Sequence, residues 1–270
     1  MSLRRYATTH LETIDAWGRN KSAAGYVYRP STVEGILELL QFARESRSRI
    51  VLRGAGRSYG DASLGAEQII LDISRLNRIL EWNPESGRIV CEAGVTIEQL
   101  WKYCIGDGWW PPVVSGTMAP TLAGALGMNI HGKNNFKVGT IGQHVAEIDV
   151  VLASGQRVTC SPTDNSELFH AVIGGFGSLG VISRVVLQMK RVSSGKLLVD
   201  PIYAKNMDHM FPYSRSEYHL RTISSAGLMP LQPAITWGVG KYIRQTTPRV
   251  MAVRSPYGLN LRTYPTIFLD

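Results

Sequence analysis

The chain has few cysteines: only Cys91, Cys104 and Cys160 occur in its 270 residues. Their number is odd and their surroundings are apolar, which argues against the disulfide framework of a small secreted protein. Their spacing matches no zinc-binding pattern, so no metal site is expected. We therefore predict three reduced cysteines in the core of an intracellular protein.

Long hydrophobic runs are also lacking. No apolar stretch approaches the roughly 20 residues that a membrane-spanning helix needs. Residues 1–6 carry positive charge, but no apolar segment follows them as it would in a signal peptide. These absences predict a cytoplasmic protein with no membrane span.

The net charge of +8 is not gathered into a basic run. Residues 201–270 hold eight Lys or Arg and three Asp or Glu, so most of the excess lies in the last quarter of the chain. No alternation of basic and aromatic residues accompanies this excess, and nucleic-acid binding is not expected.

A glycine-rich segment follows a short apolar run. Residues 48–52 read Ser-Arg-Ile-Val-Leu, and residues 53–61 read Arg-Gly-Ala-Gly-Arg-Ser-Tyr-Gly-Asp. A strand that runs into such a turn can present successive N–H groups to an anion. Arg53 and Arg57 could add hydrogen bonds to a phosphate. A tight surface turn is the alternative, and the glycine spacing is not that of a Rossmann dinucleotide site.

Two further segments are rich in small residues. Residues 113–135 include Ser-Gly-Thr at 115–117 and His-Gly-Lys-Asn at 131–134. Residues 167–181 include Gly-Phe-Gly-Ser-Leu-Gly at 175–180, which fits the pattern Gly-x-Gly-x-x-Gly. This run follows a helix pattern and precedes a strand pattern. Because that order is the reverse of the Rossmann order, NAD binding is not predicted.

Local patterns predict a mixture of helices and strands. Ser31 to Glu34 and Thr96 to Gln99 are capping-box sequences, each followed by apolar residues at helical spacing. A further short helix is expected to begin within residues 162–167 and to run through residues 169–173. Segments that predict strands lie at residues 50–52, 68–73, 88–92, 147–153, 157–160 and 180–189. Units of alternating helix and strand come first and mostly strands follow, which favours an α+β fold over a doubly wound sheet.

Taken as a set, the three glycine-rich segments resemble the PCMH-type FAD-binding domain of the vanillyl-alcohol oxidase/p-cresol methylhydroxylase superfamily. Within that superfamily, the closest resemblance is to flavoproteins of the decaprenylphosphoryl-β-D-ribose 2-oxidase group. Trp17-Gly-Arg19 also looks like this family. The resemblance implies two subdomains with FAD extended between them, and it places the strand after residues 175–180 beside the flavin.

The resemblance divides the chain into an FAD-binding domain at residues 14–190 and a C-terminal segment at residues 191–270. Family members are longer, and their second domain caps the flavin and supplies much of the substrate pocket. Seven prolines interrupt the tail from Pro201 to Pro265, and the tail shows no long periodic segment. We expect a short remnant of the cap domain, from a chain that is truncated or read out of register after about residue 200.

The resemblance also assigns flavin contacts. Several superfamily members carry, at the position of Arg57, a histidine that bonds covalently to the flavin. Arginine cannot form that bond, so non-covalent FAD is implied. The cofactor-binding residues expected from the matching motifs are Leu52, Arg53, Gly54, Ala55, Gly56, Arg57, Ser58, Tyr59, Gly60, Asp61, Ala62, Gly116, Thr117, Thr121, Leu122, Ala123, Gly124, His131, Gly132, Lys133, Asn134 and Ile182.

His131, Lys133 and Tyr59 are the candidate catalytic residues. A histidine can orient or deprotonate an alcohol, and a lysine can stabilise negative charge on a reduced flavin or a substrate phosphate. Tyr59 could donate a hydrogen bond to substrate or flavin. His144 and His170 lie within or beside apolar segments, and we expect them to be structural.

The resemblance implies an FAD-dependent oxidoreductase that oxidises a secondary alcohol of a sugar-like substrate. In its closest group the substrate is the ribose 2-hydroxyl of a polyprenyl-phosphoryl ribose. A lipid-linked substrate would bring the protein to a membrane surface, and a separate NAD(P)H-dependent reductase would complete a net epimerisation. The alternatives are an alditol or aldonolactone oxidase of the same superfamily, and a flavin-binding fragment without turnover.

Overall fold

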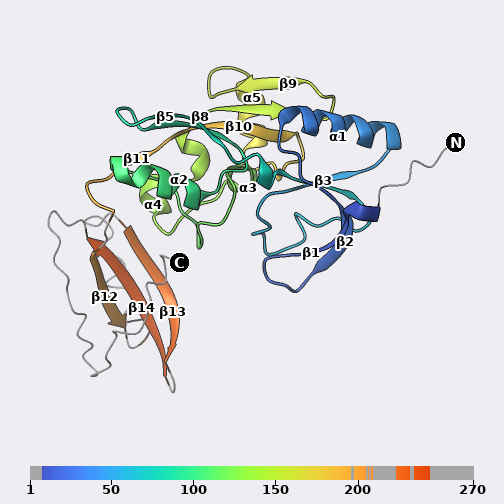
Figure 1. Cartoon of the computed structure of the whole chain (residues 1–270). Helices are drawn as coiled ribbons and strands as arrows, with labels where there is room; N and C mark the ends of the chain where they lie inside the picture. Colours follow the sequence, from blue (N-terminus) through green and yellow to red (C-terminus); the bar gives the residue numbers. More distant parts are fainter. Residues whose placement is uncertain are drawn as a thin grey trace. The chain divides into compact units, whose positions relative to one another are not determined.

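The computed structural model describes residues 8–195, 198–204, 206, 208, 223–231 and 234–243 (Figure 1). The chain divides into two units, Met1–Val192 and Ser193–Asp270. The first unit holds two larger sheets with their helices, and the second holds one sheet of three strands. This combination of helices with separate sheets confirms the α+β class.

The first sheet has four strands in the order β1-β2-β4-β3. Its strands are β1 (Leu11–Asp15), β2 (Ser22–Tyr28), β3 (Ile50–Arg53) and β4 (Ile69–Asp72). All four residues of β4 are buried, because the strand is covered on both faces. Ile69 and Leu71 pack with helix α1 (Val33–Ser46), whereas Ile70 packs with Val27. A strand in this position has no face turned to water, which explains why its first three residues are all apolar.

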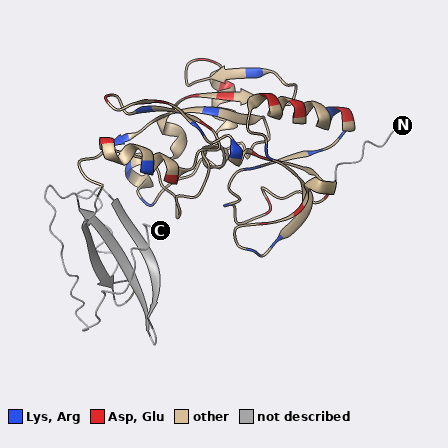
Figure 2. Cartoon of the chain, viewed as in Figure 1, with Lys and Arg blue, Asp and Glu red and all other residues tan. Residues whose placement is uncertain are grey.

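Helix α1 begins at Thr32, whose hydroxyl accepts a hydrogen bond from the Gly35 N–H at 3.1 Å. The prediction that Ser31 caps this helix is therefore wrong by one residue, because Thr32 is the N-cap and its hydroxyl pairs with the Gly35 N–H. The side chains that the helix buries are Ile36, Leu39, Leu40 and Ala43. Its acidic residues are exposed and appear as red bands along the helix in Figure 2.

The second sheet has five antiparallel strands in the order β5-β6-β10-β8-β9. Its strands are β5 (Ile79–Asn83), β6 (Arg88–Glu92), β8 (Val145–Val151), β9 (Arg157–Cys160) and β10 (Val181–Gln188). Helices α2 (Ile97–Cys104), α3 (Leu122–Gly127) and α5 (Ser166–Val172) share its core.

The three cysteines all lie buried and unpaired in the core of the second sheet, as predicted. Burial raises the pKa of the Cys91 and Cys104 thiols to about 12. It raises the pKa of the Cys160 thiol to about 11. Such thiols behave as small apolar groups that fill the core.

The remaining elements of the first unit are η1 (Thr8–His10), η2 (Ile73–Arg75), η3 (Ile105–Asp107), β7 (Trp109–Trp110), α4 (Asn135–Val138), η4 (Ile141–His144) and β11 (Lys190–Arg191). The segment after β6 packs closely on the segment after β4. A Cβ on Gly94 would lie 2.3 Å from the carbonyl oxygen of Ile73, and the Gly94 N–H donates to the Leu76 carbonyl at 2.7 Å. Glycine therefore permits the close approach of backbone between the two sheets.

Several local predictions are confirmed. The Thr96 hydroxyl accepts from the Gln99 N–H at 3.2 Å, and the Gln99 side chain accepts from the Thr96 N–H at 2.8 Å, which completes the capping box of α2. The six predicted strands correspond to β3, β4, β6, β8, β9 and β10, with ends that differ by up to two residues. The sequence patterns do not predict β1, β2 or β5. One of the five residues of β1 is buried, and none of the five residues of β5 is buried. Strands that bury so little need few apolar residues and leave only a weak pattern in the sequence.

The second unit contains an antiparallel sheet in the order β12-β14-β13. Its strands are β12 (Leu198–Ala204), β13 (Ile223–Leu231) and β14 (Ala234–Ile243). Pro201 and Pro230 lie in the two edge strands, and β14 at the centre contains no proline. Proline has no backbone N–H to donate to a neighbouring strand, so it is tolerated in edge strands, which have a neighbour on one side only. These strands were not predicted, and most of the proline-rich tail lies outside the described residues.

Candidate functional site

The glycine-rich loop begins where β3 ends, and the side chain of Arg53 holds it. Arg53 Nη1 donates to the carbonyl and hydroxyl oxygens of Ser63 at 3.3 and 3.1 Å, and Nη2 donates to the Asp15 carbonyl at 3.0 Å. Gly56 has a φ of +65°, and a Cβ there would lie 2.3 Å from Arg53 Nη2. Arg53 thus uses part of its donor set to brace the loop, a role that the sequence did not suggest.

The turn between β1 and β2 packs against the same loop. The Trp17 N–H donates to the Ser58 carbonyl at 3.1 Å, and the Arg57 guanidinium lies 4.4 Å from the centroid of the Trp17 ring. Lys21 Nζ pairs with the Asp61 carboxylate at 2.7 Å, and this hydrogen bond holds the pKa of Asp61 below its usual range. A cation–π contact between exposed groups contributes only about 0.5–1 kcal/mol, but it fixes where the Arg57 charge lies.

Helix α3 begins directly against the glycine loop. Its N-cap, Thr121, is buried, and the Thr121 hydroxyl accepts from the Gly124 N–H at 3.2 Å. A Cβ on Gly54 would lie 2.3 Å from that hydroxyl oxygen, so a larger residue must displace the loop or the helix. The first two N–H groups of α3 donate to carbonyls just beyond β6 at 2.8 and 2.7 Å. The helix start is therefore fixed between the two sheets.

The third glycine run, residues 174–180, closes around the end of α3. The Phe176 N–H donates to the Gly127 carbonyl at 2.9 Å, and Phe176 and Gly177 have φ values of +54° and +76°. A Cβ on Gly177 would lie 2.8 Å from Leu52 Cδ1, so the run reaches back to β3. It joins helix α5 to strand β10, which confirms the reversed order on which NAD binding was rejected.

These three segments line one cavity. Polar side chains come from the loop after β3, and apolar ones come from β4, α3, α5 and β10. The predicted cofactor-binding residues in its lining are Leu52, Arg53, Gly54, Ser58, Ala62, Ala123, Gly124 and Ile182. The residues of the lining that were not predicted are Ser63, Leu71, Ile73, Gly127, Met128, Val172, Phe176, Gly177, Gly180 and Val181. Five of the lining residues are glycines, which leave backbone open to a ligand.

The segment from His131 to Asn134 follows α3 and lies outside the lining of this cavity. His131 and Lys133 are exposed, whereas Gly132 and Asn134 are buried. His131 Nδ1 lies 3.3 Å from the Gly132 carbonyl oxygen. Because a carbonyl only accepts, a hydrogen bond here requires Nδ1 as the donor, and in the neutral ring Nε2 would then be the acceptor. Tyr59 is 76% exposed and is also outside the lining.

The two histidines expected to be structural contact protein groups. His144 Nε2 lies 2.8 Å from the Val138 carbonyl oxygen, and the ring of His170 lies edge-on to Phe169 at 5.3 Å. Within the described part of the chain, no group of three or more His, Cys, Asp or Glu side chains could hold a metal ion. The described helices include none that is long and apolar enough to cross a membrane.

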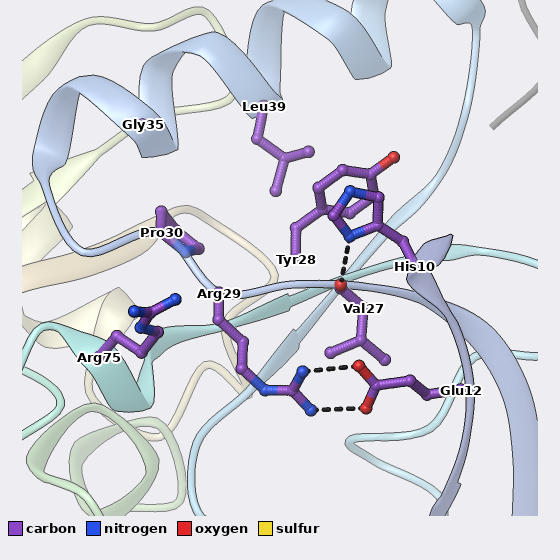
Figure 3. Close-up of a pocket in the computed structure, with 9 residues that line it drawn as sticks. All are labelled: His10, Glu12, Val27, Tyr28, Arg29, Pro30, Gly35, Leu39 and Arg75. Atoms are coloured by element: carbon purple, nitrogen blue, oxygen red, sulfur yellow. Dashed lines mark hydrogen bonds and ion pairs between the residues drawn. The ribbon is translucent and has the colours of Figure 1, made fainter. Parts of the chain in front are cut away.

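A second pocket, of about 350 Å³, lies between β2 and α1 (Figure 3). Arg29 makes two parallel bonds of 2.7 Å to the Glu12 carboxylate and one of 3.1 Å to Asp72, and its hydrogen bonds lower the pKa of Glu12. The His10 ring stacks on Tyr28 with ring centroids 4.2 Å apart. None of the predicted site residues lines this pocket. Arg29 and Glu12 are bonded to each other and Arg29 also to Asp72, which indicates a structural role for this pair.

The cavity between the sheets, of about 90 Å³, is lined by glycine backbone and hydroxyls, which can bind a diphosphate, and by apolar side chains, which can cover a flat ring. Its volume admits part of a dinucleotide, and its lining has the groups that such a cofactor needs. Fold and cavity together define a nucleotide-cofactor domain of a kind other than Rossmann. Residues 24–161 match the family described as FAD binding domain. The chain belongs to this FAD-binding family of the vanillyl-alcohol oxidase/p-cresol methylhydroxylase superfamily.

Three relatives show the range of proteins that the chain resembles. Decaprenylphosphoryl-beta-D-ribose oxidase of Mycolicibacterium smegmatis is 32% identical over 79% of this chain and 46% of the relative. A putative D-arabinono-1,4-lactone oxidase of Neurospora crassa is 26% identical, over 68% and 33%. L-gulonolactone oxidase of Bos taurus is 27% identical, over 64% and 39%. The chain thus spans less than half the length of each of these relatives.

Proposed function

We propose that this chain binds FAD without a covalent bond. The observation that carries the proposal is the meeting of three glycine-rich segments, far apart in the sequence, around one cavity. The loop from Leu52 to Ala62 would hold the diphosphate through its N–H groups and Ser58. Ala123 and Gly124 at the start of α3 would line the cavity, but their amides are bonded to the Ala93 carbonyl and the Thr121 hydroxyl and are not offered to the cofactor. Arg57, in the place where superfamily members with a covalent flavin carry histidine, offers no such link.

We further propose that the protein is an oxidoreductase acting on a secondary alcohol of a sugar-like substrate. The names of the relatives specify a ribose derivative in one case and lactones in the others. When bound, FAD supplies the two-electron acceptor for the hydride that leaves the alcohol carbon. His131 Nε2, with its lone pair, would take the hydroxyl proton, and the Lys133 ammonium would stabilise the negative charge that develops. Tyr59 would donate a hydrogen bond to the substrate.

The substrate separates two candidates within this activity. The similarity to the Mycolicibacterium smegmatis relative favours a polyprenyl-phosphoryl ribose, whose ketone product a separate NAD(P)H-dependent reductase would consume. The similarity to the other two relatives favours an aldonolactone. Turnover of one substrate and not the other, measured with an artificial electron acceptor, distinguishes the two.

The test of cofactor binding is the visible absorption spectrum of the purified chain after FAD is added and the excess is removed by gel filtration. We expect flavin bands to elute with the protein, because glycine backbone and hydroxyls are already in place to receive the diphosphate. Acid precipitation should then release the flavin into the supernatant. Folded protein, shown by circular dichroism, that retains no flavin would contradict the proposal. Flavin that stays with the acid precipitate would contradict its non-covalent character.

A further inference from the structure

Phe176 has an unusual backbone conformation for a bulky residue. Its φ is +54°, in the left-handed region, where its neighbours in the same run are Gly174 at +82° and Gly177 at +76°. A side chain in this region meets its own backbone, so glycine or asparagine normally takes such a position. An aromatic residue here is an outlier that calls for a reason.

Packing does not supply the reason. Phe176 is 62% exposed, so it gains little from burial in the core. Its N–H bond to Gly127 and the Gly174 N–H bond to Leu126, both of 2.9 Å, belong to the backbone and would form equally well with glycine or asparagine. The backbone of Phe176 thus adopts a conformation that lowers the stability of the fold, while the aromatic ring that it carries stays exposed.

The position of Phe176 indicates what the ring is for. The residue lines the cavity between the sheets, as does Met128, which is 40% exposed. Together they give the cavity an apolar edge that the described residues leave largely uncovered. A flat aromatic ring placed against Phe176 would cover part of this edge and gain a ring–ring contact.

We propose that Phe176 binds one of the two flat ring systems of the dinucleotide cofactor, adenine or isoalloxazine. The proposal rests on the proposed FAD binding and adds to it a contact that neither the glycine motifs nor the resemblance assigns. The left-handed backbone is then the means by which the loop presents the ring at the edge of the cavity.

The test compares Phe176→Asn with Phe176→Tyr. Asparagine tolerates the left-handed conformation but lacks the ring, so Phe176→Asn should melt about 2–4 °C higher without cofactor and bind FAD roughly 3- to 10-fold more weakly. Tyrosine keeps the ring, and Phe176→Tyr should match the unchanged chain in both measurements. Melting is followed by circular dichroism, and the dissociation constant by titration of FAD fluorescence.

Leu179→Asn is the matched control. Leu179 lies in the same run and is 44% exposed, but it does not line the cavity, so this change should leave FAD affinity unaltered. Titrations with ADP and with FMN identify the ring: a loss confined to ADP assigns adenine, and a loss confined to FMN assigns isoalloxazine.

Three results would overturn the proposal. Phe176→Asn could bind FAD as tightly as the unchanged chain, it could melt at a lower temperature, or Leu179→Asn could weaken binding equally. The unchanged chain serves to separate the two levels of inference. If it binds no FAD, FAD binding itself fails; if it binds and Phe176→Asn binds equally, only the role of Phe176 fails.

Discussion

Replacing Gly54 by alanine should weaken FAD binding by roughly 10- to 100-fold. The added Cβ would lie 2.3 Å from the Thr121 hydroxyl oxygen, a separation that real Cβ atoms do not adopt. Thr121 is buried and caps α3, and the helix start is bonded to backbone beyond β6, so the helix cannot move aside freely. Forcing an extra carbon into such a contact typically costs about 1–3 kcal/mol. The loop of the variant can avoid the clash by moving away from α3, so FAD binding must restore the contact, and a cost in the middle of this range corresponds to a loss of roughly 10- to 100-fold.

Gly106→Ala is the control for this experiment. Gly106 lies in η3, does not line the cavity, and a Cβ there would meet nothing within 4 Å. Both variants are compared by titration of FAD fluorescence and by the flavin absorption retained after gel filtration. If Gly54→Ala binds as tightly as Gly106→Ala, the loop and α3 are not two walls of the cofactor site.

Replacing His131 by alanine should lower kcat by roughly 10²- to 10⁴-fold, the usual contribution of a positioned general base. The residue is exposed and its Nδ1 is taken up by the Gly132 carbonyl, which leaves Nε2 for the substrate proton. Because His131 does not line the cavity between the sheets, we expect the variant to keep its flavin absorption bands. Turnover is measured with an artificial electron acceptor on the sugar or lactone substrate that the unchanged chain oxidises.

Two further measurements distinguish chemistry from structure at His131. His170→Ala removes an exposed histidine that contacts Phe169, and it should keep full turnover. Added imidazole should restore part of the activity of His131→Ala, because the exposed position admits a small base. Full activity in His131→Ala would show that another group takes the proton.

Strands buried on both faces and capped helices were predictable from the sequence. The run at residues 69–72 is apolar at three successive positions because both of its faces are covered. The Thr96 to Gln99 capping box can be recognised because the two residues that bond to each other are only three positions apart. The cap of α1 was misplaced because Ser31 and Thr32 are adjacent and both can cap. The sequence alone does not show which hydroxyl meets the free amide.

Other features depend on groups far apart in the chain. Arg53 reads as a phosphate ligand, yet its bonds to Ser63 and Asp15 form only when the loop and the β1–β2 turn are brought together. The apolar lining of the cavity from β4 and β10 has the same composition as the core, so no pattern distinguishes it. Nothing in the sequence marks Phe176, because the glycine spacing is a property of its neighbours and its own signal is a backbone angle that only coordinates reveal.

The placement of the cysteines gives this protein an internal reporter. All three thiols lie in the core of the second sheet, and the cores of the first sheet contain none. With a pKa of about 12, only about one Cys91 in ten thousand is a thiolate at pH 8, and burial keeps reagents from it as well. The rate at which a thiol-reactive dye labels the protein therefore reports how often the second sheet opens. It does not respond to motion confined to the first sheet. Labelling with and without FAD would show whether the bound cofactor suppresses opening of the second sheet.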